Sequence, residues 1–150
     1  NDLMAAAKCI RSRSDIGDRM GLFGSSMGGA VCLATAQFIC PDAIVTYAAP
    51  LKSRSIRVVG DGNGIGTMPG WLRSPFDISH HISKLRKILI FHGDKDRVVP
   101  FSDALKILEH ASEPKRLVRQ TGGDHPMSEE AHQKSFINKT VRWFETYLTA

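Results

Sequence analysis

The sequence predicts an α/β fold in which an open, mostly parallel sheet of about four strands is flanked by helices. Short runs with little polar alternation, typical of strands that are covered on both faces, alternate with stretches of helical character. Such alternation favours right-handed crossovers and a parallel sheet. The chain has 150 residues, of which 42% are hydrophobic and 23% charged, and this size and composition are typical of one globular domain.

The predicted elements follow one another in a regular order. An Ala-rich stretch predicts a helix over residues 2–11, with Asp2 at the N-terminus, where a carboxylate favours helix initiation. The strands are expected at 19–23, 43–47, 87–92 and 116–120. Between and after them, apolar or amphipathic segments predict helices over 27–39, 101–111 and 129–148.

Residues 51–84 are the exception, because they show neither a helical nor a strand period. They contain the glycine-rich stretch 60–66 and the pair His80-His81. A segment of this length between core elements is usually a functional loop. We therefore expect one domain over residues 1–150, with 51–84 as a lid or cap-like insertion.

Composition and charge argue against several classes of protein. The formal net charge is +5, but the basic residues are scattered along the chain, so no nucleic-acid partner is expected. No run approaches the roughly 18 apolar residues that a membrane helix needs, and His80-His81 lacks a third ligand at a familiar metal-site spacing. We interpret Cys9, Cys32 and Cys40, which have no disulfide or zinc spacing, as buried reduced thiols of a cytoplasmic protein.

The clearest local motif is Gly-Ser-Ser-Met-Gly at 24–28, between a predicted strand and a predicted helix. This G-x-S-x-G pattern places its central residue, Ser26, on a tight strand-to-helix turn where only small flanking residues fit. Met27 would be the first residue of the helix, and its backbone N–H would face a developing oxyanion. We therefore predict that Ser26 is a nucleophile and that Met27 contributes to an oxyanion hole.

Acidic and imidazole side chains follow the last two predicted strands. His-Gly-Asp-Lys-Asp occupies 92–96, and Gly-Gly-Asp-His occupies 122–125. Parallel strands end at the same edge of a sheet, where ligand sites form, so these side chains are expected near Ser26. A nucleophilic serine needs a base and an orienting carboxylate. Three residues are candidates for the carboxylate: Asp94, Asp96 and Asp124.

Together these motifs resemble the α/β-hydrolase superfamily over nearly the whole chain. The nucleophile elbow is matched by GSSMGG, the acid loop by HGDKDRVVP and the histidine loop by GGDHPMS. The chain is most similar to small bacterial serine esterases of the dienelactone-hydrolase-like type, although true dienelactone hydrolases carry Cys where Ser26 stands. The resemblance implies Ser26 as nucleophile, Asp96 as the acid of the pattern HGxxD and His125 as general base, without a cofactor.

The resemblance also implies an activity and a substrate class. It implies hydrolysis of a small carboxylic ester or related acyl substrate through an acyl-enzyme on Ser26. Met68, Trp71 and Phe76 are expected to line an apolar substrate site beneath the lid. The same triad would also serve a thioesterase, a peptidase or an acyltransferase.

The matched part corresponds to the C-terminal half of the family's sheet. The early strands of the family, and the loop that gives the second oxyanion donor, have no counterpart in these 150 residues. We therefore expect the strand at 19–23 to be an open edge that self-associates or pairs with a missing N-terminal part. An inactive or incomplete fragment that acts as a scaffold or assembly subunit is the alternative to an enzyme.

Overall fold

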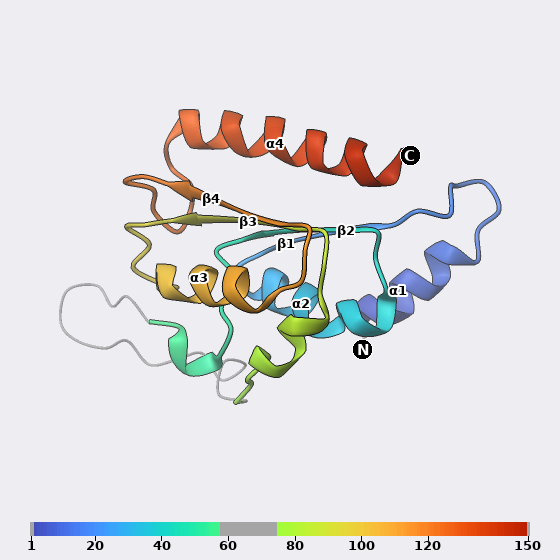
Figure 1. Ribbon diagram of the computed structural model, residues 1–150, viewed down its shortest axis with the longest axis horizontal. Coiled ribbons are helices and arrows are strands. Elements are labelled where there is room, and N and C mark those ends of the chain that lie inside the picture. Colours follow the sequence, from blue (N-terminus) through green and yellow to red (C-terminus); the bar gives the residue numbers. More distant parts are fainter. Residues whose placement is uncertain (1, 58–74, 150) are drawn as a thin grey trace.

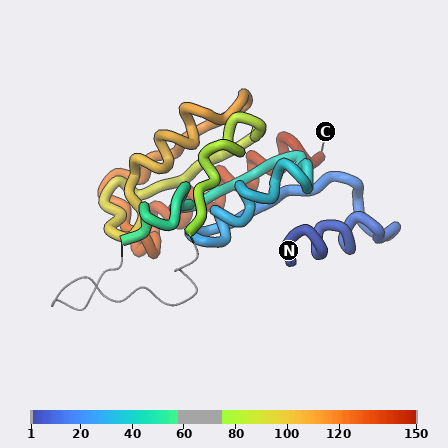
Figure 2. The backbone as a smooth tube through the Cα atoms, turned by 90° about the horizontal axis from the view of Figure 1, so that it is seen from below, coloured from blue at the N-terminus to red at the C-terminus, as the bar shows by residue number. Residues whose placement is uncertain are grey.

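The computed structural model describes residues 2–57 and 75–149, which form three layers. The elements are α1 (Asp2–Arg11), β1 (Gly21–Ser25), α2 (Met27–Ile39), β2 (Ala43–Tyr47), η1 (Ser53–Ser55), η3 (Ser79–Lys84), β3 (Ile88–Gly93), α3 (Phe101–His110), β4 (Lys115–Gln120) and α4 (Glu130–Leu148). Helix α4 covers one face of the sheet, and α1, α2 and α3 lie on the other (Figure 1). Figure 2 looks onto that second face and shows α1 set apart from the strands, where it packs on α2.

The sheet is four-stranded and entirely parallel, in the order β1-β2-β3-β4. This arrangement confirms the predicted fold class. The strand expected at 19–23 begins two residues later, because β2 begins at Ala43, whose partner in the ladder is Gly21. It then continues to Ser25, which pairs with Tyr47. All four strands point the same way, so their C-terminal ends meet at one edge.

The two central strands are buried on both faces. Every residue of β2 and β3 is buried, as their unbroken apolar sequences predict. Toward α1–α3 the core is formed by residues such as Leu33, Ile44, Ile88, Ile90 and Ile107. Toward α4 a second cluster contains Val45, Tyr47, Leu89, Phe91 and Met127. The buried central strands therefore fix the positions at which the loops at the C-terminal edge of the sheet begin.

The prediction of three buried cysteines was wrong for two of them. Cys32 is buried, whereas Cys9 and Cys40 are exposed, and all three are free thiols. Cys9 lies on α1, in which only Ala7 is buried. Cys40 caps the C-terminal end of α2 in a left-handed conformation, and its exposed thiol lies beside the carbonyl of Gln37.

The described ends of the predicted lid are joined to the domain. Lys52 and Asp77 form an antiparallel bridge and an ion pair of 2.8 Å. Ile78 and Ile82 are buried in the core, so the stretch from 78 to 84 packs as part of the domain. Residues 58–74 of the predicted lid, including Met68 and Trp71, lie outside the described residues.

Strand β1 lies at an edge of the sheet, and part of its surface is uncovered. Phe23, on the face toward α4, is 52% exposed. Pairing of this edge with another chain segment, predicted from the sequence, stays a prediction.

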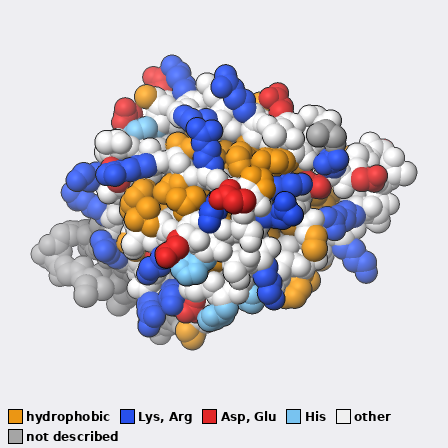
Figure 3. All heavy atoms as spheres, viewed as in Figure 1, with side chains coloured by type: hydrophobic (Ala, Val, Ile, Leu, Met, Phe, Trp, Pro, Cys, Tyr) orange, Lys and Arg blue, Asp and Glu red, His pale blue; other side chains and the backbone are white. Residues whose placement is uncertain are grey.

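Lysine and arginine side chains are spread over the face seen in Figure 3 rather than gathered in one patch. None of the described helices has the length and apolar character that a membrane span requires.

Candidate active site

Ser26 sits on a strained turn between β1 and α2. Its φ and ψ are 50° and −122°, and a positive φ is uncommon for a residue with a side chain. The turn is held because the N–H of Ser26 donates to the carbonyl of Tyr47 at 2.8 Å. Met27 is the first residue of α2, so its N–H has no acceptor within the helix. The hydroxyl and this free amide project from the same tight turn.

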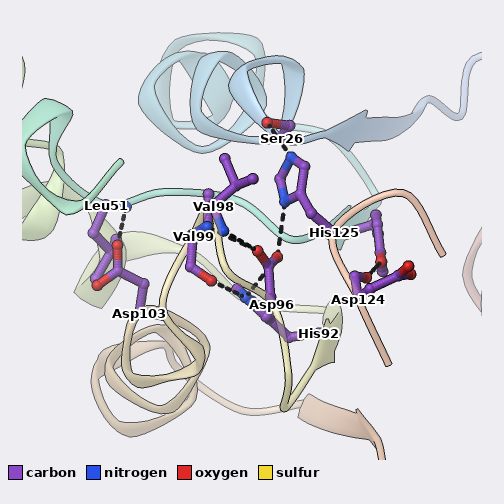
Figure 4. A network of polar contacts seen from close by, with 10 residues as sticks. Ser26, Leu51, His92, Asp96, Val98, Val99, Asp103, Asp124 and His125 are labelled. Atoms are coloured by element: carbon purple, nitrogen blue, oxygen red, sulfur yellow. Dashed lines mark hydrogen bonds and ion pairs between the residues drawn. The ribbon is translucent and has the colours of Figure 1, made fainter. Parts of the chain in front are cut away.

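The structure brings Ser26, His125 and Asp96 into one hydrogen-bonded chain (Figure 4). Nε2 of His125 lies 3.1 Å from Oγ of Ser26. Nδ1 of the same ring lies 2.8 Å from Oδ2 of Asp96. A carboxylate accepts only, so the ring proton belongs on Nδ1, and Nε2 is left to accept the serine hydroxyl. These three residues, far apart in sequence, thus have the geometry that proton transfer from a hydroxyl requires.

Asp96 is held as a buried carboxylate with a full set of donors. Its Oδ1 accepts the backbone N–H groups of Val98 at 2.8 Å and Val99 at 2.9 Å. Burial alone would raise the pKa of Asp96, but hydrogen bonds from His125, His92 and these two amides outweigh burial and bring the pKa below its ordinary value. The side chain therefore stays ionised beside His125.

The other two candidate acids bind elsewhere. Asp94 accepts from Arg119 at 2.7 Å and from the N–H of Gly122, also at 2.7 Å, and the Arg119 hydrogen bond lowers its pKa. Asp124 accepts from the N–H of Ser128 at 2.8 Å, and hydrogen bonding by Ser128 lowers its pKa. Both carboxylates therefore brace the loops at the edge of the site.

Tyr47 is a site residue that the sequence reasoning missed. Its hydroxyl donates to the backbone carbonyl of Asp124 at 2.5 Å, one residue before His125. Burial, together with the nearby charges of Asp96 and Asp124, raises the pKa of Tyr47 well above its ordinary value. Tyr47 ends the predicted strand 43–47 at the edge where sites form, and that position was the available signal.

Replacing Tyr47 with Phe should loosen the histidine loop. We expect the free energy of unfolding to fall by about 0.5–1.5 kcal/mol, because the partly buried carbonyl of Asp124 loses the Tyr47 hydroxyl and keeps only the longer bond from the N–H of Met127 at 3.4 Å. Urea denaturation measures this change. Tyr147→Phe is the matched control, since the described contacts of Tyr147 use its ring and its backbone carbonyl. Equal stability of the two variants would contradict the assigned role of Tyr47.

A hollow of about 530 Å³ lies on the α4 side of the site. It is lined by Phe23, Ser25, Tyr47, His125, Pro126, Met127, Gln133, Phe136 and Ile137. Phe76, predicted to line the substrate site, is not in this group. It packs against the core on the other face, its N–H donates to Oγ of Ser53, and it borders a separate hollow beside Lys52 and Arg54. The structure therefore does not bring Phe76 to the triad.

No cluster of three or more His, Cys, Asp or Glu side chains suited to a metal ion occurs in residues 2–57 and 75–149. The pair His80-His81 lies at η3, where Nδ1 of His81 is 2.8 Å from Nε2 of Gln37. That ring nitrogen is thus occupied by an amide.

Comparison with known proteins places this arrangement in a fold family. The chain matches 97% of its length to the esterase domain of a Rhodothermus marinus protein, with a TM-score of 0.74, 23% identity and 68% of that chain covered. It also matches the α/β hydrolase GrgF of Penicillium sp. sh18 over 99% of its length, with a TM-score of 0.79, 16% identity and 71% of that chain covered. The chain has the α/β-hydrolase fold. Its four parallel strands, with helices on both faces, match the architecture of those structures.

Curated relatives of this chain are longer than it is. It is 31% identical over 155 residues to YitV of Bacillus subtilis (strain 168), whose name proposes an esterase, covering 88% of this chain and 58% of YitV. It is 29% identical over 136 residues to the uncharacterized protein YfhR of Salmonella typhi, covering 83% of this chain and 47% of YfhR. The chain thus spans about half the length of the curated relatives it matches. No family model matches the sequence.

Proposed function

We propose that this chain carries the catalytic residues of a serine hydrolase that cleaves a small carboxylic ester through an acyl-enzyme on Ser26. The observation that carries the proposal is the hydrogen-bonded chain from Ser26 Oγ through His125 to Asp96, with contacts of 3.1 and 2.8 Å. The esterases among the structures of similar fold support the class of reaction.

The first half of the reaction forms the acyl-enzyme. Nε2 of His125 takes the hydroxyl proton of Ser26 while Oγ attacks the ester carbonyl carbon. The negative charge that develops on the carbonyl oxygen is stabilised by the N–H of Met27 and the N-terminal end of α2. When the tetrahedral intermediate collapses, the C–O bond to the alcohol breaks and His125 returns the proton to the leaving oxygen.

The second half of the reaction releases the acid. Water gives a proton to Nε2 of His125 and attacks the acyl carbon. The proton then passes to Oγ of Ser26 as the bond between Oγ and the acyl carbon breaks. Asp96 remains ionised throughout and stabilises the ring when both of its nitrogens carry protons. A second donor to the oxyanion is proposed to come from outside the described residues.

A fluorophosphonate probe tests the proposal directly. Folded wild-type protein should be labelled, because Ser26 Oγ displaces fluoride from phosphorus, and Ser26→Ala should abolish the label. Ser25→Ala is the matched control, since Ser25 is the adjacent serine at the end of β1, and it should keep the label. Folded wild-type protein that takes up no label would favour the scaffold alternative.

The leaving group is tested by a matched set of substrates. With one acyl group carried as an ester, a thioester or an amide, kcat/KM should be highest for the ester. A preference for the thioester or the amide would reassign the same triad to thioesterase or peptidase chemistry. Transfer of the acyl group to an added alcohol in preference to water would indicate an acyltransferase.

A further inference from the structure

His92 is a completely buried histidine that the proposed reaction does not use. It lies in β3, next to the glycine that ends the strand, and its side chain is inaccessible to solvent. Its Nε2 is 3.0 Å from the carbonyl oxygen of Val99 and 3.4 Å from Oδ2 of Asp96 (Figure 4). The ring packs edge-on against Phe101, with 5.8 Å between the ring centroids. The burial of a polar imidazole at this position calls for a structural explanation.

The hydrogen-bonding partners determine which ring nitrogen of His92 carries a proton. Both oxygens near Nε2 are acceptors, whereas Nδ1 has no hydrogen-bond partner within the described part of the chain. A proton on Nε2 therefore forms a hydrogen bond to the Val99 carbonyl at 3.0 Å and also faces Oδ2 of Asp96 at 3.4 Å. A proton on Nδ1 would place an N–H in the core without an acceptor.

The two oxygens of Asp96 are held in different ways. Oδ1 is fixed by the backbone amides of Val98 and Val99. Oδ2 faces His125, which stands on a loop and is partly open to solvent, and His92, which is fixed in the central sheet. During the proposed reaction the ring of His125 gains and loses a proton, so the strength of its hydrogen bond to Oδ2 changes. His92 is the partner of Oδ2 that stays unchanged.

We propose that His92 is a positioning residue that ties Asp96 Oδ2 and the Val99 carbonyl to the central sheet, so that the carboxylate keeps its orientation toward His125. This inference rests on the proposed function where it concerns rate, but the contact itself does not depend on catalysis. The hydrogen bond from His92 also helps to keep the pKa of Asp96 low despite burial.

Three variants separate positioning from simple filling of space. His92→Phe keeps a ring of similar shape but removes the N–H. His92→Gln carries an amide N–H about as far from the backbone as Nε2, and His92→Asn carries one that is too short to reach Oδ2. With an acetate ester, we expect kcat of folded His92→Phe to fall about 10- to 100-fold, the range that corresponds to losing one hydrogen bond to a charged group, with KM unchanged. Gln should restore most of kcat and Asn should not.

A carbon-13 NMR titration of the Asp96 carboxyl tests the same contact without relying on activity. The pKa of Asp96 should rise in His92→Phe and in His92→Asn, and it should stay low in His92→Gln. The other groups that act on Asp96, namely His125, Asp124 and Tyr47, are the same in every variant.

The outcomes distinguish this inference from the proposed function. An unchanged kcat in His92→Phe, or equal behaviour of Gln and Asn in the titration, would overturn the role of His92. If Phe prevents folding, the comparison of Gln with Asn decides. A titration that behaves as expected in a protein that hydrolyses no ester would support the contact and refute the esterase proposal.

Discussion

Replacing Asp96 with Asn is expected to lower kcat/KM for a simple ester by about 10⁴-fold, the size of loss measured for such a change in a serine protease. The reason lies in the direction that the new amide must take. The N–H groups of Val98 and Val99 require an oxygen at the Oδ1 position. The amide NH₂ of Asn must therefore occupy the Oδ2 position and donate toward His125.

The consequence for His125 is the wrong tautomer. A donor facing Nδ1 makes Nδ1 an acceptor and moves the ring proton to Nε2, which then cannot accept the hydroxyl proton of Ser26. The same NH₂ also faces Nε2 of His92, which carries a proton in the wild-type arrangement. Because two donors would then face each other in the core, the free energy of unfolding should fall along with activity.

The two other acidic candidates supply matched controls. Asp94→Asn keeps an oxygen for the N–H of Gly122 and weakens only the ion pair with Arg119, whose side chain is exposed to solvent. Asp124→Asn keeps an oxygen for the N–H of Ser128. Steady-state kinetics with 4-nitrophenyl acetate should find both within a few-fold of wild type. An active Asp96→Asn beside an inactive Asp94→Asn or Asp124→Asn would assign the acid to a different residue.

The elements and the order of the site residues could be predicted because they depend on local pattern. Unbroken apolar runs identify β2 and β3, and the parallel topology then brings every post-strand loop to one edge. That rule was enough to expect Ser26, an acidic residue and His125 at one edge, whereas the choice of Asp96 among three acidic candidates came from the resemblance to the family. It was less exact for β1, because a strand's first paired residue depends on where its neighbour begins, and β2 begins at Ala43.

Contacts between side chains from separate elements could not be predicted in the same way. The hydroxyl of Tyr47 reaches the carbonyl of Asp124 across 77 positions of sequence, and no local pattern encodes that distance. His92 could be interpreted as structural, but its bond to Asp96 depends on how the turn that follows β3 folds back. Phe76 shows the opposite failure: an aromatic residue near an expected lid packs on the other face of the sheet.

Gly24 and Gly28 are the first and last residues of the G-x-S-x-G motif. Replacing each with Ala should change the free energy of unfolding in opposite directions. A Cβ at Gly24 would lie 2.6 Å from the backbone N of Gly29 and 2.5 Å from the carbonyl carbon of Gly28. A Cβ at Gly28 would meet no described atom within 4 Å. These contacts are with backbone atoms, which cannot rotate away as a flexible side chain can. Accommodating a Cβ at Gly24 therefore requires β1 to move away from the first turn of α2, and this movement lowers the free energy of unfolding.

We therefore expect Gly24→Ala to lower the free energy of unfolding by about 3 kcal/mol or more, the upper range for overpacking, which is a large share of the stability of an ordinary domain. Gly28→Ala should raise it by about 0.5–1 kcal/mol, because Ala is the better helix former. Urea unfolding of both variants measures the difference. Equal destabilisation by the two changes would show that the motif's glycines serve the helix in the same way. A selective loss at Gly24 would show that the close contact between β1 and α2 supports the turn at Ser26, in addition to the hydrogen bond from Ser26 N–H to the Tyr47 carbonyl.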